Sequence, residues 1–160
     1  MSKKPLILVT NDDGITAPGI LALIEVMETL GDVVVVAPDS PQSGMGHAIT
    51  INNTLHLDKV SKKGEKTQKY SCSGTPADCV KIAINEVLDR RPDLCVSGIN
   101  HGSNSSINVI YSGTMSAAIE AGIEGIPAIG FSNLNYNWDA NFETSKKYVK
   151  RIKKKALKKG

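Results

Sequence analysis

Short, continuously apolar runs alternate along the chain with segments whose apolar residues repeat at helical spacing. This alternation limits the fold more than any other feature of the sequence. Apolar runs too short for a helix predict strands buried on both faces. Strands separated by helices predict a mostly parallel sheet with helices on both sides, a Rossmann-like doubly wound α/β fold. The expected strands are 6–9, 32–38, 92–98 and 126–132, and the expected helices are 17–31, 75–89, 112–125 and one that starts near Ala140.

Residues 48–71 interrupt this alternation. "AITINNTLHLDKV" and "TQKYSC" have the alternating pattern of strands, and "SKKGEK" between them is typical of a turn. We therefore expect a β-hairpin or arm inserted into the α/β fold around 48–71. The length of 160 residues suits one domain, 1–160, with a core of its own.

Composition excludes several classes of protein. With 41% hydrophobic and 22% charged residues, the chain is neither disordered nor fibrous. No apolar run approaches the roughly 20 residues of a membrane span or the length of a secretory signal, so we expect a cytoplasmic protein that does not bind membranes. Three cysteines without a CxxC spacing argue against both a disulfide framework and a zinc site.

Net positive charge is concentrated at one end of the chain, since the remainder has more acidic than basic residues. Residues 146–160 contain nine of the nineteen Lys and Arg residues and no acidic residue, although the formal net charge is only +3. Val149, Ile152 and Ala156 recur there at helical spacing, which predicts a helix with a solvated basic face. No aromatic stacking platform accompanies the lysines, and this argues against nucleic-acid binding.

Polar segments follow three of the predicted strands or open a predicted helix. In a parallel sheet, loops that follow strands share one edge, and ligands bind beyond that edge. We therefore expect these segments to form one site. They are "TNDDG" at 10–14, "PDSPQSGMGH" at 38–47, "SGINHGSN" at 97–104 and "YSGT" at 111–114.

Adjacent carboxylates at Asp12 and Asp13 repel each other unless water screens them or a cation lies beside them. Carboxylates with neutral oxygen donors such as Ser43 and Asn100 suit one hard divalent ion, Mg²⁺ or Mn²⁺. His47 or His101 as a ligand would favour a softer metal. The simpler alternative for Asp12 and Asp13 is an ordinary turn with a helix-capping Asp.

The segment "YSGT" is typical of an anion-binding helix N-terminus. Gly113 allows close approach to the backbone, and Ser112 and Thr114 add hydroxyl donors. Ordinary N-capping is the alternative. A hard metal beside such a helix end favours phosphate chemistry. The sequence contains no Walker A motif, and no GxGxxG fingerprint follows the first strand, so a P-loop triphosphatase or an NAD enzyme is not expected.

Five segments of the sequence match a known family in order and spacing. They are "ILVTNDDGI", "VVVVAPDSPQSGMGHAIT", "SGTPADCVK", "PDLCVSGIN" and "YSGTMSAAIEAGIEGIPAIGFS". Through them the chain resembles the SurE family, the survival protein E type of nucleotidase, over about 5–135. The resemblance implies a Rossmann-like fold and a homo-oligomer, a dimer or tetramer.

The resemblance also implies an activity. It implies a metal-dependent phosphatase acting on nucleoside 5′-monophosphates, and also on 3′-nucleotides and, in some members, short polyphosphate. Proteins of the family usually continue well beyond residue 160, so the C-terminal part of the family's domain would be absent. The implied metal ligands are Asp12, Asp13, Ser43 and Asn100, and the implied phosphate pocket is Asn104, Ser112, Gly113 and Thr114.

Two alternatives follow from the same residues. A haloacid-dehalogenase-type phosphatase would form a phospho-aspartate, but it needs two aspartates separated by one residue, whereas Asp12 and Asp13 are adjacent. A non-catalytic module that binds nucleotide or metal would use the same side chains without turnover. In the hydrolytic scheme Asp12 and Asp13 are the catalytic residues, and one of them accepts the proton of the attacking water.

Overall fold

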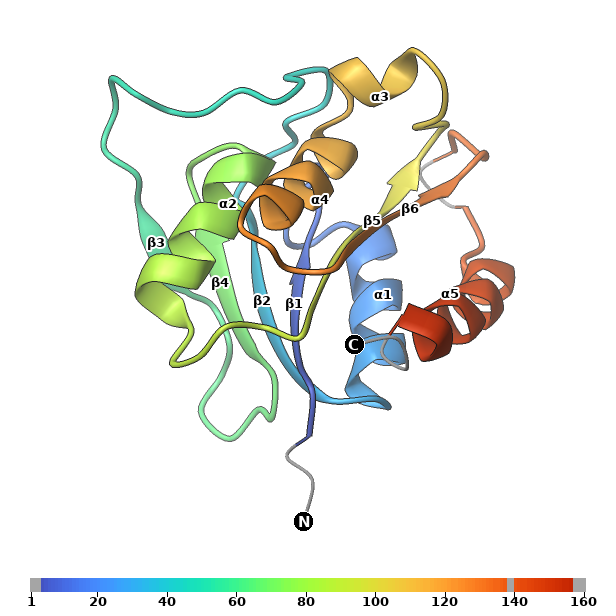
Figure 1. The fold of residues 1–160 in the computed structure, drawn as a ribbon, viewed down its shortest axis with the longest axis horizontal. Coiled ribbons are helices and arrows are strands. Elements are labelled where there is room, and N and C mark those ends of the chain that lie inside the picture. Colours follow the sequence, from blue (N-terminus) through green and yellow to red (C-terminus); the bar gives the residue numbers. More distant parts are fainter. Residues whose placement is uncertain (1–3, 138–139, 157–160) are drawn as a thin grey trace.

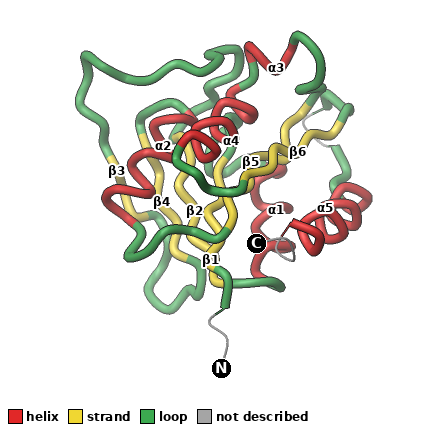
Figure 2. Tube along the Cα trace, viewed as in Figure 1, coloured by secondary structure: helices red, strands yellow, loops and turns green. Residues whose placement is uncertain are grey.

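The computed structural model describes residues 4–137 and 140–156. It consists of a single six-stranded sheet between two layers of helices (Figure 1), and Figure 2 shows the strands as the central layer. The strands are β1 (Leu6–Thr10), β2 (Asp32–Pro38), β3 (Leu57–Lys59), β4 (Gln68–Cys72), β5 (Leu94–His101) and β6 (Ala128–Asn133). The helices are α1 (Pro18–Glu28), α2 (Pro76–Ile82) with the π-helical turn η1 (Ala83–Val87), α3 (Asn108–Tyr111), α4 (Gly113–Ile123) and α5 (Glu143–Ala156).

The strand order is β3-β4-β2-β1-β5-β6, and every neighbouring pair is parallel except β3 with β4. This confirms the predicted doubly wound α/β fold. The hairpin made by β3 and β4 forms one end of the sheet, because β4 pairs directly with β2. Residues 48–56, which we expected to be strand-like, form no strand, since their polar groups bond to α2 instead.

The two faces of the sheet bury separate apolar clusters. Successive residues of a buried strand point to opposite faces, so Ile7 and Val9 join one cluster and Leu8 joins the other. The first cluster lies under α1 and α5, and the second lies under α2 and α4. The basic helix α5 is attached to the first cluster through Val149, which is 2% exposed, whereas Ile152 is exposed. No helix in the described part of the chain is long and apolar enough to cross a membrane.

The strand β5 is longer than predicted, and this changes where one site residue lies. It runs through His101, so Asn100 is on the strand rather than in the loop after it. The extension pairs with β6, where Asn100 lies opposite Ser132 after an irregularity in the register. The parallel pairing of β1, β2 and β5 brings the segments that follow them to one edge of the sheet. We call this the carboxyl edge.

Candidate metal and phosphate site

Asp12 lies directly beyond β1, packed against the first turn of α4. Its side chain is buried, at 4% exposure, and Oδ1 accepts a hydrogen bond from the hydroxyl of Thr114. At Gly113 an added Cβ would lie 2.6 Å from the Cβ of Asp12. Any larger residue at 113 would therefore displace the carboxylate, which explains why glycine occupies this position. Ser112 caps the same helix by accepting the backbone N–H of Met115 at 3.0 Å.

The two neighbouring carboxylates are both unfavourably placed for ionisation. Burial raises the pKa of Asp12 to about 6, although the Thr114 hydrogen bond lowers it, and the charge of Asp13 raises it further. Burial also raises the pKa of Asp13, while the charge and backbone amide of His101 lower it. A divalent cation between or beside these groups would stabilise both ionised forms.

Asn100 and Asn104 form a short amide network at the end of β5. The Asn100 amide nitrogen donates to the Gly102 carbonyl and to Oδ1 of Asn104, both at 3.2 Å. Asn104 in turn donates to the hydroxyl of Ser132 on β6 at 2.9 Å. These bonds fix the orientation of both side-chain amides. Because the amide nitrogen of Asn100 is used as a donor, its side-chain oxygen Oδ1 is the atom that could coordinate a cation.

The loop after β2 brings Ser43 to the same place. The backbone N–H of Gln42 donates to the Asp12 carbonyl at 2.7 Å, and the N–H of Gly46 donates to the Tyr111 carbonyl at 3.2 Å. An added Cβ at Gly46 would lie 3.0 Å from the Ile110 carbonyl oxygen. The loop is thus attached on both sides of Ser43, to the segment after β1 and to the end of α3.

These segments enclose one small cavity, which we call the carboxyl-edge cavity. Its volume is about 210 Å³, and it contains five of the eight predicted site residues. Asp13, Gly113 and Thr114 lie beside it rather than in its lining: Asp13 lies near His101, and the other two pack against Asp12. The lining residues are Asp12, Ser43, Gly44, Asn100, His101, Ser103, Asn104, Asn108, Tyr111 and Ser112.

The donor chemistry of this cavity suits a hard cation. Among the described residues no three His, Cys, Asp or Glu side chains gather into a metal-binding group, and the donors that line the cavity are mainly oxygens, from the Asp12 carboxylate, hydroxyls and amides. This is the ligand set that Mg²⁺ and Mn²⁺ prefer. Of the two histidines considered from the sequence, His101 lines the cavity and stacks edge-on against Phe142, whereas His47 bonds to Glu120.

Sequence reasoning did not identify Tyr111 and Asn108 as lining residues. They belong to α3, a four-residue helix whose N-cap position makes no side-chain hydrogen bond. Tyr111 directly precedes Ser112, the N-cap of α4. This position could have indicated Tyr111 as a lining residue, because the N-terminus of α4 was expected at the carboxyl edge.

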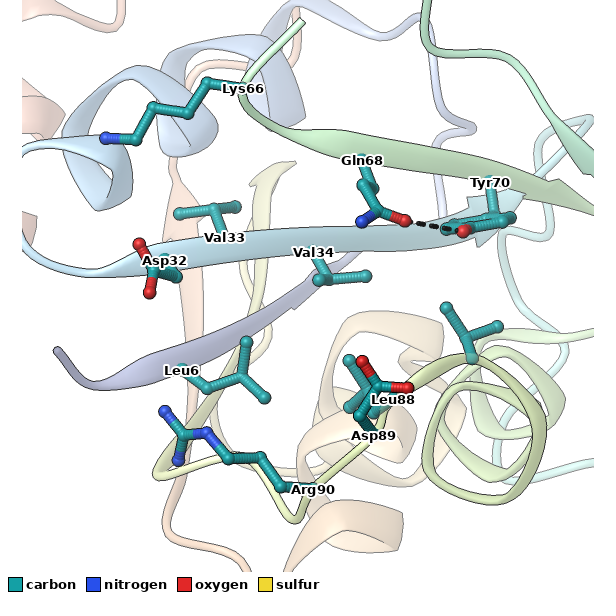
Figure 3. Close-up of a pocket in the computed structure, with 11 residues that line it drawn as sticks. Leu6, Asp32, Val33, Val34, Lys66, Gln68, Tyr70, Leu88, Asp89 and Arg90 are labelled. Atoms are coloured by element: carbon teal, nitrogen blue, oxygen red, sulfur yellow. Dashed lines mark hydrogen bonds between the residues drawn. The ribbon is translucent and has the colours of Figure 1, made fainter. Parts of the chain in front are cut away.

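A second and larger cavity, of about 580 Å³, lies at the opposite edge of the sheet, where the strands begin. We call it the amino-edge cavity. Figure 3 shows Leu6, Val33 and Val34 along its strands, with Lys66 and Arg90 at different sides. Asp32 and Asp89 also line it, but they come from different segments and are not adjacent in sequence. Size alone would favour this cavity, whereas the paired carboxylates and the amide network are at the other edge.

Comparison with known proteins identifies the family of the chain. The family model described as "Survival protein SurE" matches residues 7–160. The chain belongs to the SurE family. A protein named 5′-nucleotidase SurE from Flavobacterium johnsoniae is 75% identical over 156 residues, which are 98% of this chain and 60% of that relative. A relative of the same name from Bacteroides thetaiotaomicron is 54% identical over 99% of this chain and 61% of the relative.

A solved structure shows the same fold. The crystal structure of the SurE protein from Aquifex aeolicus matches this SurE-family chain with a TM-score of 0.87 and 43% sequence identity. The match covers 98% of this chain and 61% of that one. The chain thus spans about three fifths of the length of the curated relatives and of the solved structure that it matches.

Proposed function

We propose that this SurE-family chain carries a metal-dependent phosphomonoesterase site that hydrolyses nucleoside 5′-monophosphates to nucleoside and phosphate. We include 3′-nucleotides and short polyphosphate as further substrates. One observation supports this above all: Asp12, Ser43 and Asn100, from three distant segments, line the same cavity. The name 5′-nucleotidase, given to relatives up to 75% identical, supports the choice of substrate.

In this proposal Asp12, Asp13, Ser43 and Asn100 hold one divalent cation, Mg²⁺ or Mn²⁺. Such a cation neutralises phosphate charge and lowers the pKa of a bound water. The chain's own contribution is orientation: Thr114 and Gly113 fix the carboxylate of Asp12, and the amide network fixes Asn100. Asp12 or Asp13 accepts the proton of the water that attacks phosphorus in line with the departing ribose oxygen.

The phosphate oxygens are bound by Ser112, Gly113 and Thr114 at the start of α4 and by Asn104 in the segment after β5. The positive end of a helix dipole and the backbone N–H groups there favour an anion. The hydroxyl of Thr114 is already donated to Asp12, so in this proposal Thr114 holds that carboxylate through its hydroxyl and joins the phosphate pocket through its backbone N–H. Charge on the phosphate would thereby be balanced on one side by the cation and on the other by α4.

Release of inorganic phosphate from AMP tests the proposal. Mg²⁺ or Mn²⁺ should support turnover, a chelator should abolish it, and Asp12→Ala should remove it while circular dichroism stays unchanged. Metal-supported turnover that survives in Asp12→Ala would contradict the scheme. Trapping of a phospho-aspartate would favour the haloacid-dehalogenase alternative instead.

A non-catalytic module is the second candidate, and one observation favours it: Asp13, one of the two proposed catalytic carboxylates, does not line the carboxyl-edge cavity. Binding of AMP and Mn²⁺ by calorimetry without release of phosphate would identify such a module. Assembly into a homo-oligomer and location in the cytoplasm stay predictions. Sedimentation and cell fractionation would test them.

A further inference from the structure

A buried carboxylate outside the carboxyl-edge cavity connects two elements of the site. Glu120 lies on α4, seven residues after Gly113, and is 6% exposed. Its Oε2 is 2.7 Å from Nε2 of His47, and its Oε1 is 3.1 Å from Nζ of Lys81 on α2. Neither contact was predicted from the sequence, because an acidic residue within a helix of small residues is usually exposed.

The two contacts keep Glu120 ionised in spite of its burial. Burial alone would raise the pKa of Glu120, but the hydrogen bonds and charges of His47 and Lys81 outweigh it, so the pKa is lowered. Burying an ionised carboxylate without such partners costs folding free energy. The loss of either contact should therefore disturb the position of the Glu120 side chain. Glu120 therefore holds both partner side chains in defined places.

His47 belongs to the loop that carries Ser43, four residues earlier. This loop lies largely exposed on the surface, and the side chain of His47 is itself about one-third exposed, at 32%. Backbone hydrogen bonds attach the loop near Asp12 and Tyr111. The contact of His47 with Glu120 adds a side-chain attachment to α4, the helix whose first turn holds Asp12.

We propose that His47 and Glu120 are positioning residues, which fix the Ser43 loop against α4 and thereby set the affinity of the site for its divalent cation. The inference rests on the proposed function, since it takes Ser43 as a metal ligand. If the contact is lost, the loop keeps its backbone attachments, but Ser43 is less well ordered beside Asp12. Residues that orient metal ligands in this way commonly change affinity without touching the metal.

Lys81 provides a matched control. It contacts the same carboxylate, at 3.1 Å, but it comes from α2 rather than from the loop that carries Ser43. Loss of Lys81 therefore disturbs Glu120 without releasing the loop. A purely structural role for the cluster predicts similar effects of changing either partner, whereas positioning of the loop predicts different ones.

The test measures Mn²⁺ binding by electron paramagnetic resonance on the full chain and on His47→Ala, His47→Gln and Lys81→Met. We expect His47→Ala to weaken Mn²⁺ binding about tenfold, as is typical when residues that orient metal ligands are removed. His47→Gln keeps a donor near the position of Nε2 and should restore most of the affinity. Lys81→Met should stay within about twofold of the parent, as surface changes usually do. Activity of His47→Ala should fall more at limiting than at saturating Mn²⁺.

Equal loss of affinity in His47→Ala and Lys81→Met, or no loss in His47→Ala, would overturn the inference. If His47→Ala does not fold, His47→Asn replaces it, since its shorter amide does not reach Glu120; unchanged affinity there would have the same meaning. Asp12→Asn and Ser43→Ala separate the two proposals. If they leave Mn²⁺ binding unchanged, the proposed metal site fails, whereas weaker binding in them with no effect of His47→Ala rejects only the positioning role.

Discussion

The two edges of the sheet carry cavities of opposite character. The amino-edge cavity is the larger, at about 580 Å³ against about 210 Å³, and has apolar strand residues in its lining. Its hydrogen bonds are mostly made by half-buried or exposed groups: Tyr70 donates to Gln68 two residues away, and Arg90 donates to the distant Lys4 carbonyl. At the carboxyl edge, Thr114 bonds to Asp12, 102 positions earlier, and Asn104 bonds to Ser132. A buried carboxylate that is bonded to a distant hydroxyl, rather than volume, therefore marks the candidate site, since Asp32 and Asp89 at the other edge are exposed.

The largest expected difference between the two edges comes from making the same Asp→Asn substitution at each. Asp12→Asn should lower kcat/KM for AMP by more than about 100-fold, since changing residues that merely surround metal ligands already costs about 10–100-fold. Asp32→Asn, at the amino-edge cavity, should leave kcat/KM unchanged within about twofold. Phosphate release measured at saturating Mn²⁺ checks both. A large loss in Asp32→Asn would show that the larger cavity takes part in catalysis.

The pH dependence of stability gives a second, smaller difference. The folded pKa of Asp12 is raised from 3.8 to about 6, so the folded state binds more protons than the unfolded state between these values. In the metal-free chain Asp12 should therefore contribute a loss of stability of about 2–3 kcal/mol as pH rises from about 4 to about 6. Urea unfolding in the presence of a chelator measures this loss.

Three controls accompany that measurement. Asp12→Asn should remove most of the slope, and Mn²⁺ should restore stability above pH 6, because the cation favours the ionised carboxylate. Asp32→Asn should keep the slope of the parent chain. A slope that persists in Asp12→Asn would mean that another group dominates the linkage.

Two glycines of α4 test the close packing at the carboxyl edge. Gly113→Ala should destabilise the chain by about 1–3 kcal/mol and impair metal binding, because its Cβ would lie 2.6 Å from that of Asp12. Gly122 is exposed and has nothing within 4 Å of an added Cβ, so Gly122→Ala should stabilise the helix by about 0.5–1 kcal/mol. Thermal unfolding compares the two, and a neutral Gly113→Ala would contradict the packing described.

The smallest expected effect is at the amino-edge cavity. Tyr70→Phe removes the hydroxyl that donates to Gln68 at 2.7 Å, but keeps the ring. We expect a change in stability of no more than about 0.5 kcal/mol and no change in phosphate release. Chemical denaturation and the AMP assay would check this, and a loss of turnover would again assign a role to the larger cavity.

The sequence predicted the fold well where a segment is buried and regular. The apolar runs at 6–9 and 32–38 identified β1 and β2, and Thr75 and Ser112 cap the predicted helices. Alternation failed at 48–56, because the backbone N–H of Thr50 bonds to Asp78 on α2 rather than to a neighbouring strand. Such long-range contacts leave no periodic signal.

The site, like the fold, was predicted where it depends on regular strands and missed where it depends on contacts between residues distant in sequence. Placing loops at one edge of a parallel sheet was enough to bring together Asp12, Ser43 and Asn100, which line one cavity. It could not show that Asn100 lies on the extended β5, nor that Glu120 is buried against His47, since both depend on partners distant in sequence. Their roles as ligands and positioning residues stay predictions.

The central claim is that a divalent cation binds at the carboxyl edge with Asp12 as its anchor. An anomalous difference map from crystals of the chain soaked in Mn²⁺ tests it directly. We predict one peak in the carboxyl-edge cavity, within coordination distance of Asp12 and absent in Asp12→Asn. A map without a peak there, or with its peak in the amino-edge cavity, would contradict the account.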